Sequence, residues 1–218
     1  MALDDIREEL LKGYNDIVAS GIDYGNRGII TKRVDASDDF VTKNILVNTG
    51  ITKDSIVAAS EDSSVYEADY RNCLHKLIYK KFPDVKVILQ LDSRWCSIWS
   101  GLGENLPPVT AIHASTFGGE IPCINPNREN VEGDFFKKLD YSIVSRLACI
   151  NLAEKHCIFI KHVGPLVFAD SVEEAIQLHK VLEEACFRAY YISNSDSTLE
   201  YMPYQLSRYM MEGKNNAN

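Results

Sequence analysis

The stretch Val85–Gly101, VKVILQLDSRWCSIWSG, predicts the centre of the fold. Its apolar run Val87–Leu89 is typical of a buried strand. The run then turns polar at Gln90 and Asp92, which stand two residues apart and therefore point to the same side of an extended chain. A strand that ends in polar groups and leads into a helix N-terminus is a common place for a functional site.

The residues that follow this strand predict a helix. Ser93 suits the N-cap position, and the helical spacing directs Trp95, Ile98 and Trp99 toward the core. We interpret both tryptophans as core residues rather than as a platform for stacking sugars. The alternative to a functional site is that Asp92 or Ser93 only caps the helix.

Length and composition predict one domain over residues 1–218. The net charge of −8 argues against nucleic acid or an anionic membrane as a partner. No apolar run reaches the ~18 residues of a membrane span, and the N-terminus lacks the pattern of a signal peptide. The six cysteines are scattered without a Cys-x-x-Cys pair. We therefore expect free thiols, a reducing compartment and a cytoplasmic protein.

Periodicity along the chain predicts alternating helices and strands. Besides the helix after Ser93, helices are expected at 3–19, 70–82, 111–117, 135–152, 171–191 and 201–211. Strands are expected at 28–33, 44–47, 87–89, 157–160 and 166–168, and a disordered tail at about 212–218. The core stripe of the long helix is predicted to comprise Val172, Ala175, Ile176, His179, Leu182, Cys186 and Ala189. This alternation indicates a single α/β domain.

Two turns rich in Gly, Asn and Thr are candidate anion sites. One contains Gly25 and Asn26, and the other contains Thr49 and Gly50. Turns of this composition can direct backbone N–H groups toward an anion. The alternative is that each turn is an ordinary connection between strands.

Several short motifs, taken together, resemble the class II aldolase/adducin family, and most closely its L-ribulose-5-phosphate 4-epimerase branch. In order they are YGN (24–26), NTG (48–50), H-x3-Y-x2-FP (75–83), S-R-x3-IW (93–99), P-x4-HA-x2-F-x-G (108–119), IPC (121–123), GP (164–165) and VLEEA (181–185). The resemblance implies a central, mainly antiparallel sheet flanked by helices. It also implies a cyclic homotetramer whose sites lie between subunits, and a zinc ion that polarises a sugar carbonyl.

The zinc ligands that the resemblance implies are replaced in this sequence. The family places a His-x-His pair at the end of the central strand, where this chain has Gln90 and Asp92. A later histidine precedes a Gly-Pro pair, where this chain has Val163, with His162 one residue early. The family's carboxylate position holds Arg71, or Val65 if Ser63-Ser64 is aligned as the family's Ser-Ser pair.

We therefore expect no metal cofactor. Zinc prefers nitrogen and sulfur ligands, which Gln90, Asp92 and a misplaced His162 do not supply. A weak magnesium or manganese site involving Asp92 and His162 is the alternative, and the charge of Arg71 opposes it. An ion pair between Arg71 and Asp92 is predicted where the metal would lie.

Other positions of the family's site also differ. Ser115 replaces the acid–base aspartate, Val47 stands where the family has a lysine, and Tyr209 is the candidate for a C-terminal tyrosine that reaches a neighbouring subunit. The retained part of the phosphate site comprises Gly25, Asn26, Thr49 and Gly50. Zinc-dependent aldol chemistry is not expected from this set.

Two hypotheses about function remain open. The first is an enzyme with altered, metal-independent chemistry on a small polyhydroxylated or phosphorylated ligand, such as a sugar phosphate. Asp92 would be the base and Arg71 the cationic anchor, with Gln90, Ser115 and Tyr209 as hydrogen-bonding groups. The second is an inactive oligomeric binding or structural subunit: a ligand sensor, a structural oligomer, or an inactive subunit beside an active paralogue. The compact domain without an added interaction segment favours the enzyme.

Overall fold

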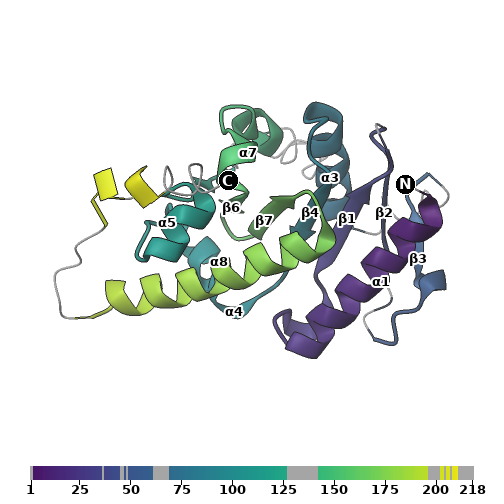
Figure 1. The fold of residues 1–218 in the computed structure, drawn as a ribbon, viewed down its shortest axis with the longest axis horizontal. Helices are drawn as coiled ribbons and strands as arrows, with labels where there is room; N and C mark the ends of the chain where they lie inside the picture. Colours follow the sequence, from purple (N-terminus) through teal and green to yellow (C-terminus); the bar gives the residue numbers. More distant parts are fainter. Residues whose placement is uncertain are drawn as a thin grey trace, which may run out of the picture.

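A seven-stranded sheet forms the centre of the computed structural model (Figure 1). The structure describes residues 2–35, 37–44, 47, 49–60, 69–126, 142–195, 202–203, 205–206 and 208–210. The strand order is β3-β2-β1-β4-β7-β6-β5. All neighbouring strands run antiparallel except β5 and β6, which are parallel. The sheet is therefore mainly antiparallel, as predicted.

The strands are short, and the helices vary widely in length. The strands are β1 (Ile29–Arg33), β2 (Phe40–Lys43), β3 (Ile56–Ala58), β4 (Val87–Gln90), β5 (Cys123–Ile124), β6 (Cys157–Ile160) and β7 (Gly164–Ala169). The α-helices are α1 (Leu3–Ser20), α3 (Tyr70–Lys81), α4 (Arg94–Leu102), α5 (Ala111–Phe117), α7 (Leu152–Lys155) and α8 (Val172–Ser193). Two 3-10 turns are η1 (Tyr24–Asn26) and η2 (Lys53–Ser55).

Helices cover both faces of the sheet, so the strands are buried on both sides. Val87 and Leu89 of β4 join the apolar cluster under α1, α4 and α8. Ile88, between them, joins the second cluster, which contains α3 residues. Alternate side chains of a strand point to opposite faces. This explains why the central strand is a continuous apolar run, and Figure 1 shows α1 and α8 over the sheet.

Several predicted elements are confirmed. The helix at 111–117 and the strand at 157–160 have the expected bounds. All seven residues of the predicted core stripe in α8 are buried. The first helix ends at Gly21, which adopts a left-handed conformation with φ 63°. Glycine tolerates this conformation without the steric cost that other residues incur.

Other boundaries were predicted wrongly. A strand was expected at 44–47, but β2 lies at Phe40–Lys43, where Val41 and Thr42 pair with β3. Residues 45 and 46 of the expected strand lie outside the described residues. Strand β3 was not predicted from the sequence. Ile98 is 39% exposed rather than buried. Parts of the helices expected at 135–152 and 201–211, and the whole tail 212–218, lie outside the described residues, and Leu152 begins a separate helix, α7.

Within the described residues, no helix combines the length and the apolar character needed to cross a bilayer.

Candidate functional site

The candidate site lies where the end of β4 meets the loop between α1 and β1. The buried carboxylate of Asp23 accepts hydrogen bonds from the amides of Gly28 (2.7 Å) and Asp92 (2.9 Å). The amide of Tyr24 donates to the carbonyl of Asp92 at 2.8 Å. These three bonds fix the loop against the strand end. The loop carries Gly25, Asn26 and Arg27 to the same place.

The predicted ion pair between Arg71 and Asp92 is wrong, because each side chain has a different partner. Arg71 pairs with Asp69, with Nε at 2.6 Å from the carboxylate, and it also donates to the carbonyl of Arg27 at 2.8 Å. Asp92 pairs with Arg27 at 2.9 Å and accepts from the hydroxyl of Ser97 at 2.8 Å. Asp69 caps α3 two residues before Arg71, so the nearest carboxylate belongs to the same helix end.

The two ion pairs differ in their exposure to solvent. The Arg71 and Asp69 side chains are 16% and 5% exposed, whereas those of Arg27 and Asp92 are 61% and 43% exposed. Arg27 and Asp92 are therefore the charged groups of this site that a ligand from solvent reaches first.

Gln90 is buried, and its side chain contacts His75 rather than solvent. Its Oε1 lies 3.3 Å from Nε2 of His75, and Nδ1 of His75 lies 2.9 Å from the hydroxyl of Thr31. Burial lowers the pKa of His75 to about 3, so the ring is neutral at pH 7. Nε2 therefore carries the proton that Gln90 accepts, and Nδ1 accepts from Thr31.

Sequence reasoning missed a lysine at this site. Lys43, on β2, is buried, donates to the carbonyl of Asn26 at 2.7 Å and lies 5.2 Å from the centre of the Tyr14 ring. Burial lowers the pKa of Lys43, and the charge of Asp23 partly offsets this effect. The resemblance placed the family's lysine position at Val47, so Lys43, at the end of β2, was not singled out.

The predicted anion-binding residues fall on two loops. Gly25 and Asn26 have left-handed φ values of 78° and 55° beside Lys43. Thr49 and Gly50 are exposed in the connection after β2, and Gly50 also has a positive φ of 61°. Among the described residues, no hydrogen bond links the first pair to the second. Anion binding by these residues stays a prediction.

The remaining candidates lie apart from the strand end. The hydroxyl of Ser115 donates within its own helix, to the carbonyl of Ile112 at 3.2 Å. Tyr209 is 71% exposed. His162, one residue before the family's histidine position, is exposed in the turn between β6 and β7 with φ 62°. The structure thus brings Arg71, Gln90 and Asp92 into one region, without Ser115 or Tyr209 among their contacts.

The donor groups at the end of β4 do not fit the zinc ion that the family resemblance implies. Gln90 already accepts from His75, and the Asp92 carboxylate is held by Arg27 and Ser97. His162 adds no third ligand to this set, since its side chain is in an exposed turn. Zinc sites use three or four converging nitrogen, sulfur or carboxylate ligands. Within the described ranges, this region does not supply them.

One other group could be considered for a metal. Among the residues that the structure describes, ligand atoms of Cys96, His179 and Glu183 lie within 4.8 Å of one another between α4 and α8. The hydroxyl of Ser93 lies among them, 2.9 Å from His179 Nε2 and 2.7 Å from Glu183, and it also bonds Cys96. Burial raises the pKa of the Cys96 thiol and lowers that of His179 to about 4. These side chains form an internal hydrogen-bond network, and the Ser93 hydroxyl occupies the place between them that a metal ion would need.

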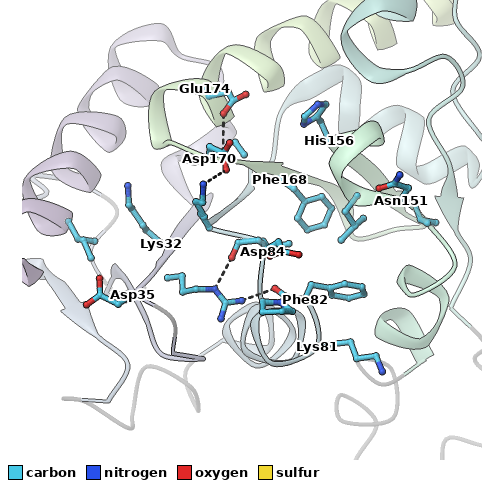
Figure 2. Close-up of a pocket in the computed structure, with 18 residues that line it drawn as sticks. Lys32, Asp35, Lys81, Phe82, Asp84, Asn151, His156, Phe168, Asp170 and Glu174 are labelled. Carbon is cyan, nitrogen blue, oxygen red and sulfur yellow. Dashed lines mark hydrogen bonds and ion pairs between the residues drawn. The ribbon is translucent and has the colours of Figure 1, made fainter. Parts of the chain in front are cut away.

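A cavity of about 930 Å³ lies at the opposite end of the sheet (Figure 2). Its polar walls are largely paired with one another. Lys86 pairs with Asp170 at 2.8 Å, and the guanidinium of Arg33 donates to the carbonyls of Val85 and Phe82 at 2.8 Å each. This cavity contains none of the predicted site residues.

The site at the end of β4 has a defined chemical capacity. It presents one exposed carboxylate, Asp92, beside the guanidinium of Arg27, with the cations of Arg71 and Lys43 behind the loop. Guanidinium groups bind carboxylates and phosphates, and a carboxylate can accept a proton. The arrangement is suited to a small anionic or hydroxylated ligand.

Comparisons with known proteins agree with the fold and indicate a family. The profile described as "Class II Aldolase and Adducin N-terminal domain" matches residues 8–190. L-ribulose-5-phosphate 4-epimerase UlaF from Salmonella paratyphi C (strain RKS4594) is 24% identical over 142 residues, which cover 63% of this chain and 62% of that protein. The match thus spans less than two thirds of the relative.

Two solved structures share the fold over nearly the whole chain. An L-fuculose 1-phosphate aldolase has a TM-score of 0.74 at 15% identity and covers 99% of this chain and 98% of its own. The L-fuculose-1-phosphate aldolase from Thermus thermophilus has a TM-score of 0.64 at 16% identity, with 88% and 96% covered. The class II aldolase fold predicted from the sequence is therefore confirmed.

Proposed function

Because the chain belongs to the class II aldolase and adducin family, we propose that it is an enzyme acting without a metal on a small sugar phosphate. The support is the exposed Arg27–Asp92 pair at the end of β4, where the resemblance implies a metal. Relatives named for L-ribulose 5-phosphate and L-fuculose 1-phosphate suggest the ligand class.

The proposed chemistry assigns one role to each charge. Asp92 accepts a proton from a sugar hydroxyl, because its carboxylate reaches solvent. Arg27 binds the phosphate, and Arg71, behind the loop, stabilises the negative charge that develops as the proton leaves the hydroxyl oxygen. Gln90 acts indirectly, by holding the neutral His75 in place. Roles for Ser115 and Tyr209 require a second subunit that supplies them.

Binding of L-ribulose 5-phosphate tests the anion site. We would measure its affinity by calorimetry in the presence of EDTA, with L-ribulose and inorganic phosphate as comparison ligands. Arg27→Gln should weaken binding about tenfold, since charged hydrogen bonds contribute about 1.5–3 kcal/mol. Arg188→Gln is the matched control, because Arg188 is another exposed arginine with a carboxylate partner, Glu184.

Asp92→Asn separates binding from chemistry. This substitution removes the carboxylate that competes for Arg27, so the phosphate should bind more tightly. Turnover, followed by NMR, should fall at least about a hundredfold, because the catalytic base is lost. Turnover that requires an added divalent metal would contradict the proposal. Equal turnover by wild type and Asp92→Asn would also contradict it.

A second candidate is an inactive binding or structural subunit. The observation in its favour is that both arginines already have carboxylate partners, which is also expected of a filled, inactive site. Tight binding of L-ribulose 5-phosphate without any turnover would support this alternative.

We also propose that the chain forms a homotetramer in the cytoplasm. Apolar side chains exposed on α4, α5 and α8 provide contact area for other subunits: Ile98, Leu102, Ile112, Tyr191 and Ile192. The six free cysteines are consistent with a reducing compartment. Light scattering of the purified protein would measure the mass, and a monomer at micromolar concentration would contradict the tetramer.

A further inference from the structure

We propose a second ligand site in the pocket between α1, α4 and α8, for a small anion that carries a flat aromatic ring. This goes beyond the proposed function, because the pocket lies outside the Arg27–Asp92 site and needs none of its chemistry. The pocket has a volume of about 630 Å³. Small-molecule sites commonly measure about 300–1,000 Å³, so a mononucleotide-sized ligand fits.

The walls of this pocket provide aromatic surface. Trp95 and Phe187 line it, with ring centres 5.1 Å apart and planes at 64°. Tyr24, which is 69% exposed, lines it from the η1 turn. Trp95 also packs on Tyr190, with a separation of 5.6 Å between centres. The indole is thus held in place from within the protein while its pocket side can stack on a ligand ring.

The charges of the pocket favour an anion. Arg94 and Lys180 line it, and within the described part of the chain neither side chain forms an ion pair or a hydrogen bond. The two acids that line it are already occupied. Glu183 accepts from the amides of Trp95 and Cys96 and from Ser93, and Glu184 pairs with Arg188 at 2.7 Å. Arg188 neutralises Glu184, whereas the neutral donors leave the charge of Glu183 in place. Two cations therefore remain against one carboxylate, and the net charge is positive.

The position of the pocket connects it to the candidate site. Tyr24 lines the pocket, and its amide donates to the carbonyl of Asp92. Arg94 follows Asp92 by two residues at the start of α4. A ligand in the pocket would therefore contact the same loop that carries Gly25, Asn26 and Arg27, from its other side.

Calorimetry with AMP, GMP, UMP and phenyl phosphate tests the inference on the full chain. At least one should bind, and Arg94→Gln and Lys180→Gln should each weaken it about tenfold. Lys86→Gln removes an equal charge at the far end of β4 and should change nothing. Adenosine lacks the charge and ribose 5-phosphate lacks the ring, so each should compete with AMP about tenfold less well.

Tryptophan fluorescence gives a second readout, because Trp95, one of the two tryptophans of the chain, lines the pocket. Binding should quench this fluorescence in the wild type and in Arg27→Gln, because the exposed Arg27 side chain pairs with Asp92 and does not line the pocket. No binding by any of the four probes at millimolar concentration would overturn the inference. Loss of binding in Arg27→Gln with retention in Arg94→Gln would also overturn it, since the anion would then occupy the candidate site.

Discussion

Replacing Glu183 by alanine tests how the helix after the central strand is held. Glu183 lies on α8, yet its carboxylate accepts from the amides of Trp95 (2.9 Å) and Cys96 (3.0 Å) and from the hydroxyl of Ser93 (2.7 Å). Ser93 occupies the N-cap position of α4 but forms no side-chain cap bond. The first turn of α4 therefore depends on a residue from another helix.

The expected loss follows from these three bonds. Glu183→Ala leaves two helix amides and one hydroxyl without their charged acceptor, and a bond to a charged group contributes about 1.5–3 kcal/mol. Water replaces part of this because the region is half-buried, so we expect the free energy of unfolding to fall by about 3 kcal/mol. Glu183→Gln retains one acceptor oxygen and should cost about 1 kcal/mol.

Urea denaturation followed by circular dichroism would measure both variants. The control is Glu184→Ala, because Glu184 is the next residue on the same helix and forms only an exposed pair with Arg188. That change should cost less than about 0.5 kcal/mol. If Glu183→Ala and Glu184→Ala lowered the free energy of unfolding equally, the capping role of Glu183 would be refuted.

Three further outcomes can be measured in the same way. Gly28→Ala would place a Cβ 2.4 Å from Cδ2 of Leu91, so it should lower the free energy of unfolding by about 2 kcal/mol. Gly101→Ala has open space around the new Cβ in helix α4, so it should raise the free energy of unfolding by up to about 1 kcal/mol. Arg33→Lys should cost about 3 kcal/mol in urea unfolding, because lysine cannot replace the fork that reaches four carbonyls. The lowered pKa of His75, about 3 when folded, means that the unfolded state takes up its proton first, below pH 6.5. The stabilisation that neutral His75 contributes is therefore complete above pH 6.5 and is lost toward pH 3. Between pH 5.5 and 4, His75→Gln should reduce the slope of the free energy of unfolding against pH by about 1.4 kcal/mol per pH unit. Potentiometric measurement of proton uptake on unfolding would check this result.

Much of the fold could be predicted because its signals are local. The apolar run before Gln90 and the stripe along α8 each follow the period of one element, and tertiary packing did not alter them. The second strand was predicted to begin at Asn44, whereas β2 begins at Phe40 and ends at Lys43. The cap of α4 by Glu183 could not be found from the sequence, since the two residues are about ninety positions apart.

The candidate site was predicted less well because its charges have alternative partners. Arg71 and Asp92 were correctly located at one end of β4, but a pairing between them assumed that no closer carboxylate was present. Asp69 stands at the N-cap of α3, and an aspartate just before a helix is a recognisable cap signal. Arg27 lies in the YGNRG loop and could not be placed beside Asp92 without the bonds that Asp23 makes to both ends.

The unequal exposure of the two ion pairs determines how an anion would enter this site. An exposed pair such as Arg27–Asp92 contributes about 0–1 kcal/mol, so a phosphate can displace the carboxylate at little cost. Separating Arg71 from Asp69 would leave a charge uncompensated in a largely buried place, which costs several times more. Arg27 is therefore the arginine that an incoming anion should engage, although the sequence had directed attention to Arg71. Arg71 then keeps the loop in place by donating to the carbonyl of Arg27, and its positive charge attracts the anion from the other side of the loop.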